Sequence, residues 1–139
     1  MELRICDAQS SAADSSALEA LVAACIAQAA IDEAEGVPFD DPPSSYIEEN
    51  FWRAIRYGLD GKLIDLVREE EFPAAQVAER LLAWTEPARS ELGVEPALPD
   101  SNGAQRQRQT LEAGASLQEI YATEVDATQH TYATEEVSA

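Results

Sequence analysis

The sequence has few cysteines, few aromatic residues and very few positive charges. Its 139 residues include two cysteines, one histidine and nine lysines or arginines against 27 acidic residues. The formal net charge is therefore −18, and the pI is near 4.1. Such a chain has no basic stripe to release counterions from a nucleic-acid backbone, and an anionic membrane would repel it. We expect neither nucleic acid nor a membrane as a partner.

Cysteine and histidine are too sparse for a disulfide framework or a zinc site. Cys6 and Cys25 lack the spacing of metal ligands, and His130 stands alone in a polar segment. An acid and an arginine within the first four residues break the pattern of a signal peptide. The apolar run from Leu18 to Ile31 is short, rich in alanine and followed by acids. We therefore expect no targeting segment and no transmembrane segment.

Acidic residues are abundant and spread along the whole chain. Eight of the nine cations are arginine, and 45% of the residues are hydrophobic, which is enough for one core. Self-repulsion at this net charge opposes a compact state in dilute buffer but is screened in high salt. We expect a salt-adapted cytoplasmic protein; an ordinary acidic soluble protein is the alternative.

The spacing of apolar residues predicts an α+β fold that is mainly helical, with four or five helices and one or two strands. The expected strands are residues 1–7 and a short strand at KLIDLV. The first two expected helices run from caps at 14–16 to about 34, and from a capping box of Ser45 and Glu48 to Gly58. Three more run from Pro73 to Gly93 with a kink or split at Pro87, from Asn102 through Leu111, and from a capping box of Ser116 and Glu119 to about Ala133. The first strand needs a partner strand, which we expect to lie outside this chain.

Glu2 and Arg4 are the first candidates for chemistry. Two residues apart on a strand, their side chains emerge on the same face, roughly 7 Å apart along the chain. A carboxylate can hold Mg²⁺ and a guanidinium can neutralise a phosphoryl group in transfer, so the pair suits ATP-dependent chemistry. An ion pair on an exposed sheet face fits the same spacing. Spacing alone favours the ion pair, because the pattern is very weak.

The segment ENFWRAIRYGLDGKLIDL sets three cations within ten residues of an otherwise acidic chain. Arg53 follows Glu49 by four residues, the spacing of an ordinary ion pair along a helix. Arg56 follows Trp52 by four and can stack on its ring, or it can bind an anionic substrate or a nucleotide. The spacing favours a structural role for Arg53 and does not decide the role of Arg56.

Arg106 and Arg108 form another cationic pair, near the start of a predicted helix. The helix dipole already makes that end positive, so arginines there need an anion or a carboxylate as a partner. A functional contact and an interdomain ion pair both satisfy this requirement.

Several blocks in order carry a resemblance to a known family: ELRICD, a long helix, ENFWRAIRYGLDGKLIDL, AERLLAWTEPARSELG, NGAQRQR and a last helix ending near TYA. From Met1 to about Ala133 the chain resembles the C-terminal portion of the carboxylate-amine ligases of the type 2 glutamate-cysteine ligase family. The resemblance implies a glutamine-synthetase-like fold, in which one face of an antiparallel sheet carries the active site and helices back the other.

It also implies an ATP-dependent ligation. The γ-carboxylate of glutamate is phosphorylated, and an amine, typically that of cysteine, attacks the acyl phosphate, while Mg²⁺ bridges nucleotide phosphates to acidic side chains. By this resemblance Glu2 is the metal-binding acid of the strand, and Arg4 is the catalytic arginine that steadies the transferred phosphoryl group.

One part of the family pattern is missing. Family members begin with a strand that bears paired glutamates, and no E-x-E strand precedes Glu2. We therefore expect residues 1–133 to be the C-terminal portion of a ligase domain, with a frayed acidic tail at 134–139. Such a fragment would need its missing N-terminal half and would not ligate anything alone.

Several alternatives stay open. The chain could be a free-standing acidic helical interaction module, or part of a ligase for another amine, and it could form a homo-oligomer. Its acidity also resembles that of the ligases that make γ-glutamylcysteine in salt-loving archaea.

Overall fold

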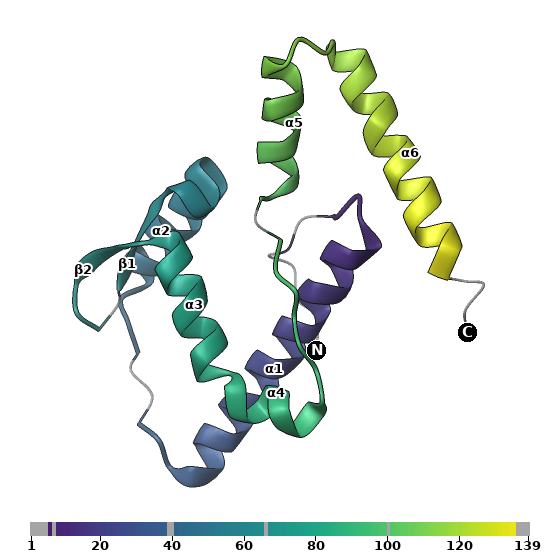
Figure 1. Cartoon of the computed structure of the whole chain (residues 1–139). Coiled ribbons are helices and arrows are strands. Elements are labelled where there is room, and N and C mark those ends of the chain that lie inside the picture. The colour runs from purple at the N-terminus through teal and green to yellow at the C-terminus, as the bar shows by residue number, and fades with distance from the viewer. Residues whose placement is uncertain (1–5, 7, 39–40, 66, 100, 136–139) are drawn as a thin grey trace. The chain divides into compact units, whose positions relative to one another are not determined.

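The computed structural model describes residues 6, 8–38, 41–65, 67–99 and 101–135, with side chains up to residue 129 (Figure 1). These residues form six α-helices, one 3₁₀ turn and one two-stranded antiparallel sheet, which confirms the predicted mainly helical α+β class. The elements are α1 (Ala12–Glu35), α2 (Ser44–Tyr57), the 3₁₀ turn η1 (Gly58–Asp60), β1 (Lys62–Asp65), β2 (Glu70–Pro73), α3 (Ala74–Trp84), α4 (Glu86–Leu92), α5 (Gly103–Glu112) and α6 (Leu117–Glu135).

The chain divides into two compact units. One, which we call the hairpin unit, is Leu21–Val94 and holds most of α1, the elements α2 to α4 and both strands. The other, the termini unit, joins Met1–Ala20 to Glu95–Ala139 and holds the start of α1 with α5 and α6.

The predicted strand KLIDLV is confirmed as β1, but its partner β2 was not predicted. The two strands pair from Lys62 opposite Pro73 to Asp65 opposite Glu70. The sequence EEFP of β2 has only one large apolar residue and ends in proline, so it lacks the signal of a strand. The turn between the strands is held by Asp65, whose Oδ1 accepts hydrogen bonds from the backbone N–H of Val67 (3.1 Å) and Arg68 (3.0 Å).

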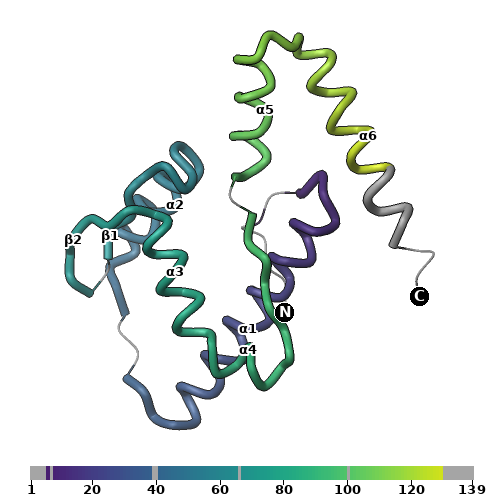
Figure 2. The backbone as a smooth tube through the Cα atoms, viewed as in Figure 1, coloured from purple at the N-terminus to yellow at the C-terminus, as the bar shows by residue number. Residues whose placement is uncertain are grey.

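Helix α2 is attached to the hairpin through Asn50, and the backbone trace in Figure 2 shows β1 beside α2, with β2 beyond it. The side-chain amide of Asn50 donates to the carbonyl of Ile64 (2.8 Å), and its oxygen accepts from the N–H of the same residue (2.7 Å). Asn50 therefore occupies the place of a neighbouring strand residue along the outer edge of β1.

The core of the hairpin unit is made of small residues where α1 meets α4. Ala24 and Ala88 are fully buried, and the buried Gln28 accepts a hydrogen bond from the backbone N–H of Ala88 (3.2 Å). Gln28 also donates to Asp32 (2.8 Å), which in turn accepts from the indole N–H of Trp84 (2.8 Å). This chain of hydrogen bonds fixes α1 against the junction of α3 and α4.

Several helix boundaries follow the predictions. Pro87 splits the predicted helix into α3 and α4, and Gly93 ends α4 in the left-handed conformation. Asn102 caps α5 in a capping box with Gln105, and Ser116 exchanges hydrogen bonds with Glu119 before α6.

Three start positions were predicted wrongly. Helix α1 begins at Ala12, where the Ser11 hydroxyl accepts from the N–H of Asp14 (3.4 Å), rather than at the predicted caps. Ser45 does not cap α2, because the helix already begins at Ser44, after Pro43 at the N-cap position. Pro73 precedes α3 rather than lying in its first turn. The predicted strand at 1–7 is described only at residue 6, and the predicted tail at 134–139 only at residues 134 and 135, which end α6; the rest of both lies outside the described residues and stays a prediction.

Helix α1 is long and apolar enough to cross a membrane, judged by its length and composition alone. The same properties belong to core helices, and Gln28 and Asp32 on α1 bind groups of α4 and α3. The expectation that the chain has no transmembrane segment stays a prediction.

Replacing Asn50 by alanine should lower the free energy of unfolding by about 1 to 3 kcal/mol, because both polar groups of Ile64 lose a part-buried partner. The Asn50→Asp variant separates the two hydrogen bonds. Its carboxylate can still accept from the N–H of Ile64, but it cannot donate to the carbonyl of Ile64. Urea unfolding followed by circular dichroism measures both, and an Asn50→Ala variant within 0.5 kcal/mol, about the scatter of neutral surface changes, would contradict this role.

Candidate functional site

Two of the three residues predicted to carry chemistry lie outside the described part of the chain. Glu2, predicted as a metal ligand, and Arg4, predicted as the catalytic arginine, are not among the described residues, so their roles stay predictions. Arg56, predicted to contact a nucleotide, is described and lies in the last turn of α2.

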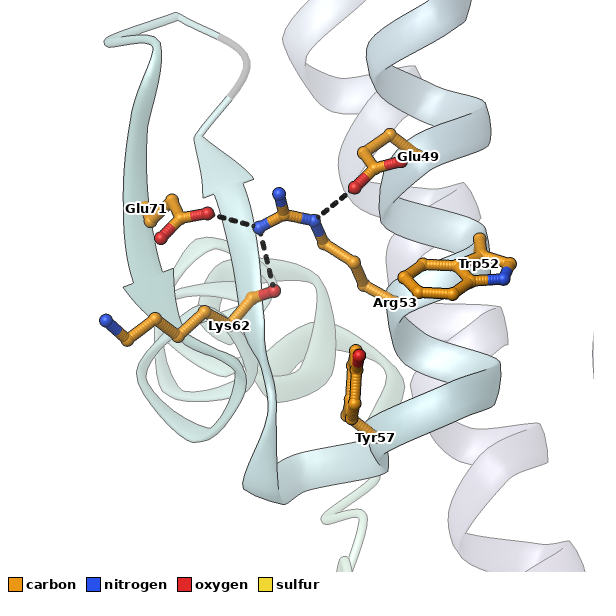
Figure 3. Close-up of a pocket in the computed structure, with 6 residues that line it drawn as sticks. All are labelled: Glu49, Trp52, Arg53, Tyr57, Lys62 and Glu71. Atoms are coloured by element: carbon orange, nitrogen blue, oxygen red, sulfur yellow. Dashed lines mark hydrogen bonds and ion pairs between the residues drawn. The ribbon is translucent and has the colours of Figure 1, made fainter.

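A hollow of about 220 Å³ opens between α2 and the hairpin, and Arg56 is not among the residues that line it (Figure 3). It is lined by charged and aromatic side chains: Glu49, Trp52, Arg53, Tyr57, Lys62 and Glu71. The first four come from α2, Lys62 begins β1 and Glu71 lies in β2, so the pairing of the strands brings together residues that are 22 positions apart in the sequence.

Arg53 is the centre of this hollow. Its Nε donates to Glu49 (2.7 Å), as the sequence spacing predicted, and its Nη1 donates to Glu71 (2.6 Å) and more weakly to the carbonyl of Lys62 (3.5 Å). Hydrogen bonds to Glu49 and then to Glu71 raise the pKa of the Arg53 guanidinium, and the bond from Arg53 lowers the pKa of the Glu71 carboxyl. Arg53 therefore ties α2 to both strands, and its positive charge is compensated by two carboxylates.

The aromatic wall of the hollow differs from the expected stacking. Arg56 lies over the ring of Tyr57, 5.7 Å from its centroid, and not over Trp52 as the spacing suggested. Trp52 instead meets Tyr57 edge to face, with the ring centroids 5.7 Å apart. Gly61 allows this arrangement, since a Cβ at that position would come within 2.7 Å of the Cβ of Tyr57.

Both carboxylates of the hollow are already paired with an arginine. That arginine is Arg53, and the hollow contains one further cation, Lys62. Within the described ranges no group of three or more histidine, cysteine, aspartate or glutamate side chains could hold a metal ion.

Glu71 is the member of the hollow that sequence analysis did not single out, whereas Lys62 is one of the three clustered cations noted there. The pattern of KLIDLV predicted a single strand, and nothing in the sequence gave the partner strand or the register that sets Glu71 beside Arg53.

A second arginine, Arg80 of α3, binds the hairpin on the face opposite to that of Arg53. It lies over the ring of Phe72, 4.0 Å from the centroid, and binds Asp65 (2.9 Å). Hydrogen bonds from the backbone of Arg68 and Val67 lower the pKa of Asp65, aided by the charges of Arg68 and Arg80. The hairpin is thus held by an arginine from each of its two neighbouring helices.

Arg106 has the carboxylate partner that its position at the start of a helix required. Within the termini unit its Nη2 donates to Asp14 (2.6 Å), 92 residues earlier in the chain, and its Nη1 donates to the carbonyl of Ser101 (2.6 Å). The predicted alternative was an ion pair between domains; the observed ion pair lies within one unit. Arg108, on the next part of α5, is exposed.

We expect Glu71→Gln to lower Tm at neutral pH by about 1 to 4 °C, because it removes a charged partner of Arg53. The folded-state pKa of Glu71 is depressed, so its ionisation stabilises the fold above the unfolded-state pKa, about 4.3, and this contribution is lost as the pH falls through the folded value. The difference between variant and parent should therefore narrow below about pH 4. Glu70→Gln, on the opposite face of the same strand, is the control, and an equal loss in both variants would contradict the assignment.

Arg106→Ala should lower the free energy of unfolding by about 1 kcal/mol, since its side chain is one-third exposed and solvent weakens the pair with Asp14. Arg108 lies on the same helix, and Arg108→Ala removes the same charge. This control should change the free energy of unfolding by less than about 0.3 kcal/mol. Hydrogen exchange at the first turn of α1, followed in both variants, locates the effect; faster exchange there only in Arg108→Ala would reverse the assignment.

Comparison with known proteins places these elements in a family. Residues 1–136 match the profile of the glutamate-cysteine ligase family 2. A protein of Solibacter usitatus provisionally named glutamate–cysteine ligase 2 is 32% identical over 137 residues, covering 94% of this chain and 36% of its own length. Similar provisionally named proteins of Sorangium cellulosum and Rubrobacter xylanophilus are 34% and 35% identical, covering 84% and 86% of this chain.

The chain spans about a third of the length of these relatives: 36%, 29% and 33% respectively. No solved structure matches it closely enough to be counted as similar. The match over nearly the whole chain shows that the protein belongs to the glutamate-cysteine ligase family 2.

Proposed function

We propose that the chain is part of an ATP-dependent ligase that joins the γ-carboxylate of glutamate to the amine of cysteine. The family match over residues 1–136 carries this proposal. A γ-carboxylate oxygen takes the terminal phosphoryl group of ATP and ADP leaves; the cysteine amine then attacks the acyl carbon and inorganic phosphate leaves. ATP and Mg²⁺ are the proposed cofactors.

The proposed roles of single residues come from the family resemblance. Glu2 is proposed as a metal ligand and Arg4 as the arginine that neutralises the transferred phosphoryl group. Arg56 is proposed to contact the nucleotide or another anion, since it is exposed and lies over Tyr57, one of the residues that line the hollow. Arg53 is not a candidate, because Glu49 and Glu71 already compensate its charge.

We further propose that activity needs the part of the ligase that this chain does not span. About two thirds of each relative's length lies outside the match, so substrate and metal contacts from that part are expected to complete the site. The acidic, arginine-rich composition supports a cytoplasmic, salt-adapted setting, and assays belong in high salt.

A free-standing interaction module is the second candidate, favoured by the large apolar side chains that α2 exposes. It predicts cooperative unfolding with no effect of ATP and Mg²⁺ on Tm. A nucleotide-dependent rise in Tm of the chain would favour the ligase assignment.

ADP release with glutamate, cysteine, ATP and Mg²⁺ tests the proposed function. The chain joined to the rest of the ligase should release ADP, and the chain alone should not. Arg4→Ala in the joined protein should lower turnover by at least about a hundredfold, as expected for loss of a charge contact in the transition state. Arg108→Ala is the matched control. Near-normal turnover of Arg4→Ala would show that the arginine is structural, and equal activity without the rest of the ligase would overturn the fragment proposal.

A further inference from the structure

Helix α2 carries a row of large apolar side chains that the hairpin unit leaves uncovered. Ile47, Phe51 and Ile55 recur every four residues, so they lie next to one another along the helix. Their exposed fractions are 50%, 50% and 70%, and no described residue of α2 is buried. We call these three residues the α2 stripe.

The α2 stripe lies on a different side of the helix from the contacts that attach α2 to the hairpin. Those contacts come from Asn50 and Arg53, which bind Ile64 and Glu71. Successive residues of a helix are turned by about 100°, so Phe51 points well away from Asn50. The hairpin therefore occupies one side of α2 and leaves the stripe for another partner.

The charge of the chain disfavours a second copy of itself as that partner. Each copy carries a formal charge of −18, so a dimer through α2 would bring two strongly acidic chains together. The relatives supply a different candidate, because about two thirds of the length of each lies outside the match to this chain. A domain that is divided between two segments buries apolar residues between them.

We propose that the α2 stripe is the surface onto which the remaining segment of the ligase docks, on the same polypeptide or on a separate one. This inference rests on the proposed function, because the ligase activity and the docking surface both require the part of the ligase that this chain does not span. The segment should present an apolar surface to Phe51, with Ile47 and Ile55 packed to either side of it. The hydrogen bonds of Asn50 would hold α2 in place for this contact.

The experiment compares one substitution in two settings. The first is the chain alone, and the second is the full-length Solibacter usitatus relative with its matched segment replaced by this chain. Ile55→Asp should shift Tm of the chain alone by less than about 2 °C, because Ile55 is exposed there. In the full-length chimera the same change should lower Tm by at least about 4 °C, because a carboxylate would enter an apolar contact. If Ile55→Asp abolishes soluble chimera, Ile55→Ala should give a smaller loss of the same sign.

Val67→Asp is the matched control, since Val67 belongs to the same unit, lies in the hairpin turn and is also 70% exposed. It should leave Tm unchanged in both settings. Equal effects of the two substitutions, or an equal effect of Ile55→Asp in both settings, would overturn the proposal. So would a dimer of the chain alone in sedimentation that Ile55→Asp dissociates, because the occupant would then be a second copy.

The same samples separate this inference from the proposed function. A chimera that shows the setting-dependent loss with Ile55→Asp but releases no ADP supports docking and contradicts the ligase activity. A chimera that releases ADP and keeps its Tm with Ile55→Asp contradicts docking alone.

Discussion

The hairpin unit depends on one constraint: the apolar side chains that its described elements bury are small. The buried apolar residues are mostly alanines, and the largest side chain that is fully buried is that of Thr85. Burial of alanine contributes little hydrophobic free energy per residue, so polar contacts must fix the geometry of the elements. Gln28 fixes α1 against α4, Asn50 fixes α2 against β1, and arginines from α2 and α3 hold the two strands.

These polar contacts give the hollow beside α2 a structural role, because its central residue, Arg53, attaches α2 to the hairpin. Arg53 appeared in the sequence as a charge anomaly in an acidic chain, and its neighbours account for it without any ligand. The same holds for Arg106, whose partner Asp14 neutralises a cation that the helix dipole would otherwise disfavour. One arginine of each of the two cationic clusters that suggested anion binding therefore stabilises the fold, and Arg56 and Arg108 keep open roles among the described candidates.

Local patterns predicted most of the helices and failed where tertiary pairing decides. Gly58, Pro87, Gly93 and Asn102 end, split or cap helices through properties of the single residue, and each acts as expected. Strand β2 and the contact between Arg53 and Glu71 depend on a register that only the folded hairpin defines. The ring that Arg56 approaches was also missed, because Trp52 and Tyr57 contact each other and Tyr57 is the nearer partner. For the family, the order of several sequence blocks was more informative than any one spacing.

The contact between Asn50 and Ile64 also limits how the small sheet can grow. The edge strand of a sheet has unpaired backbone N–H and C=O groups, which can pair with a strand of another chain and cause aggregation. On β1 the Asn50 amide takes both outward groups of Ile64, and Arg53 approaches the carbonyl of Lys62. That edge is therefore closed to strand addition, and any strand that extends this sheet must join along β2.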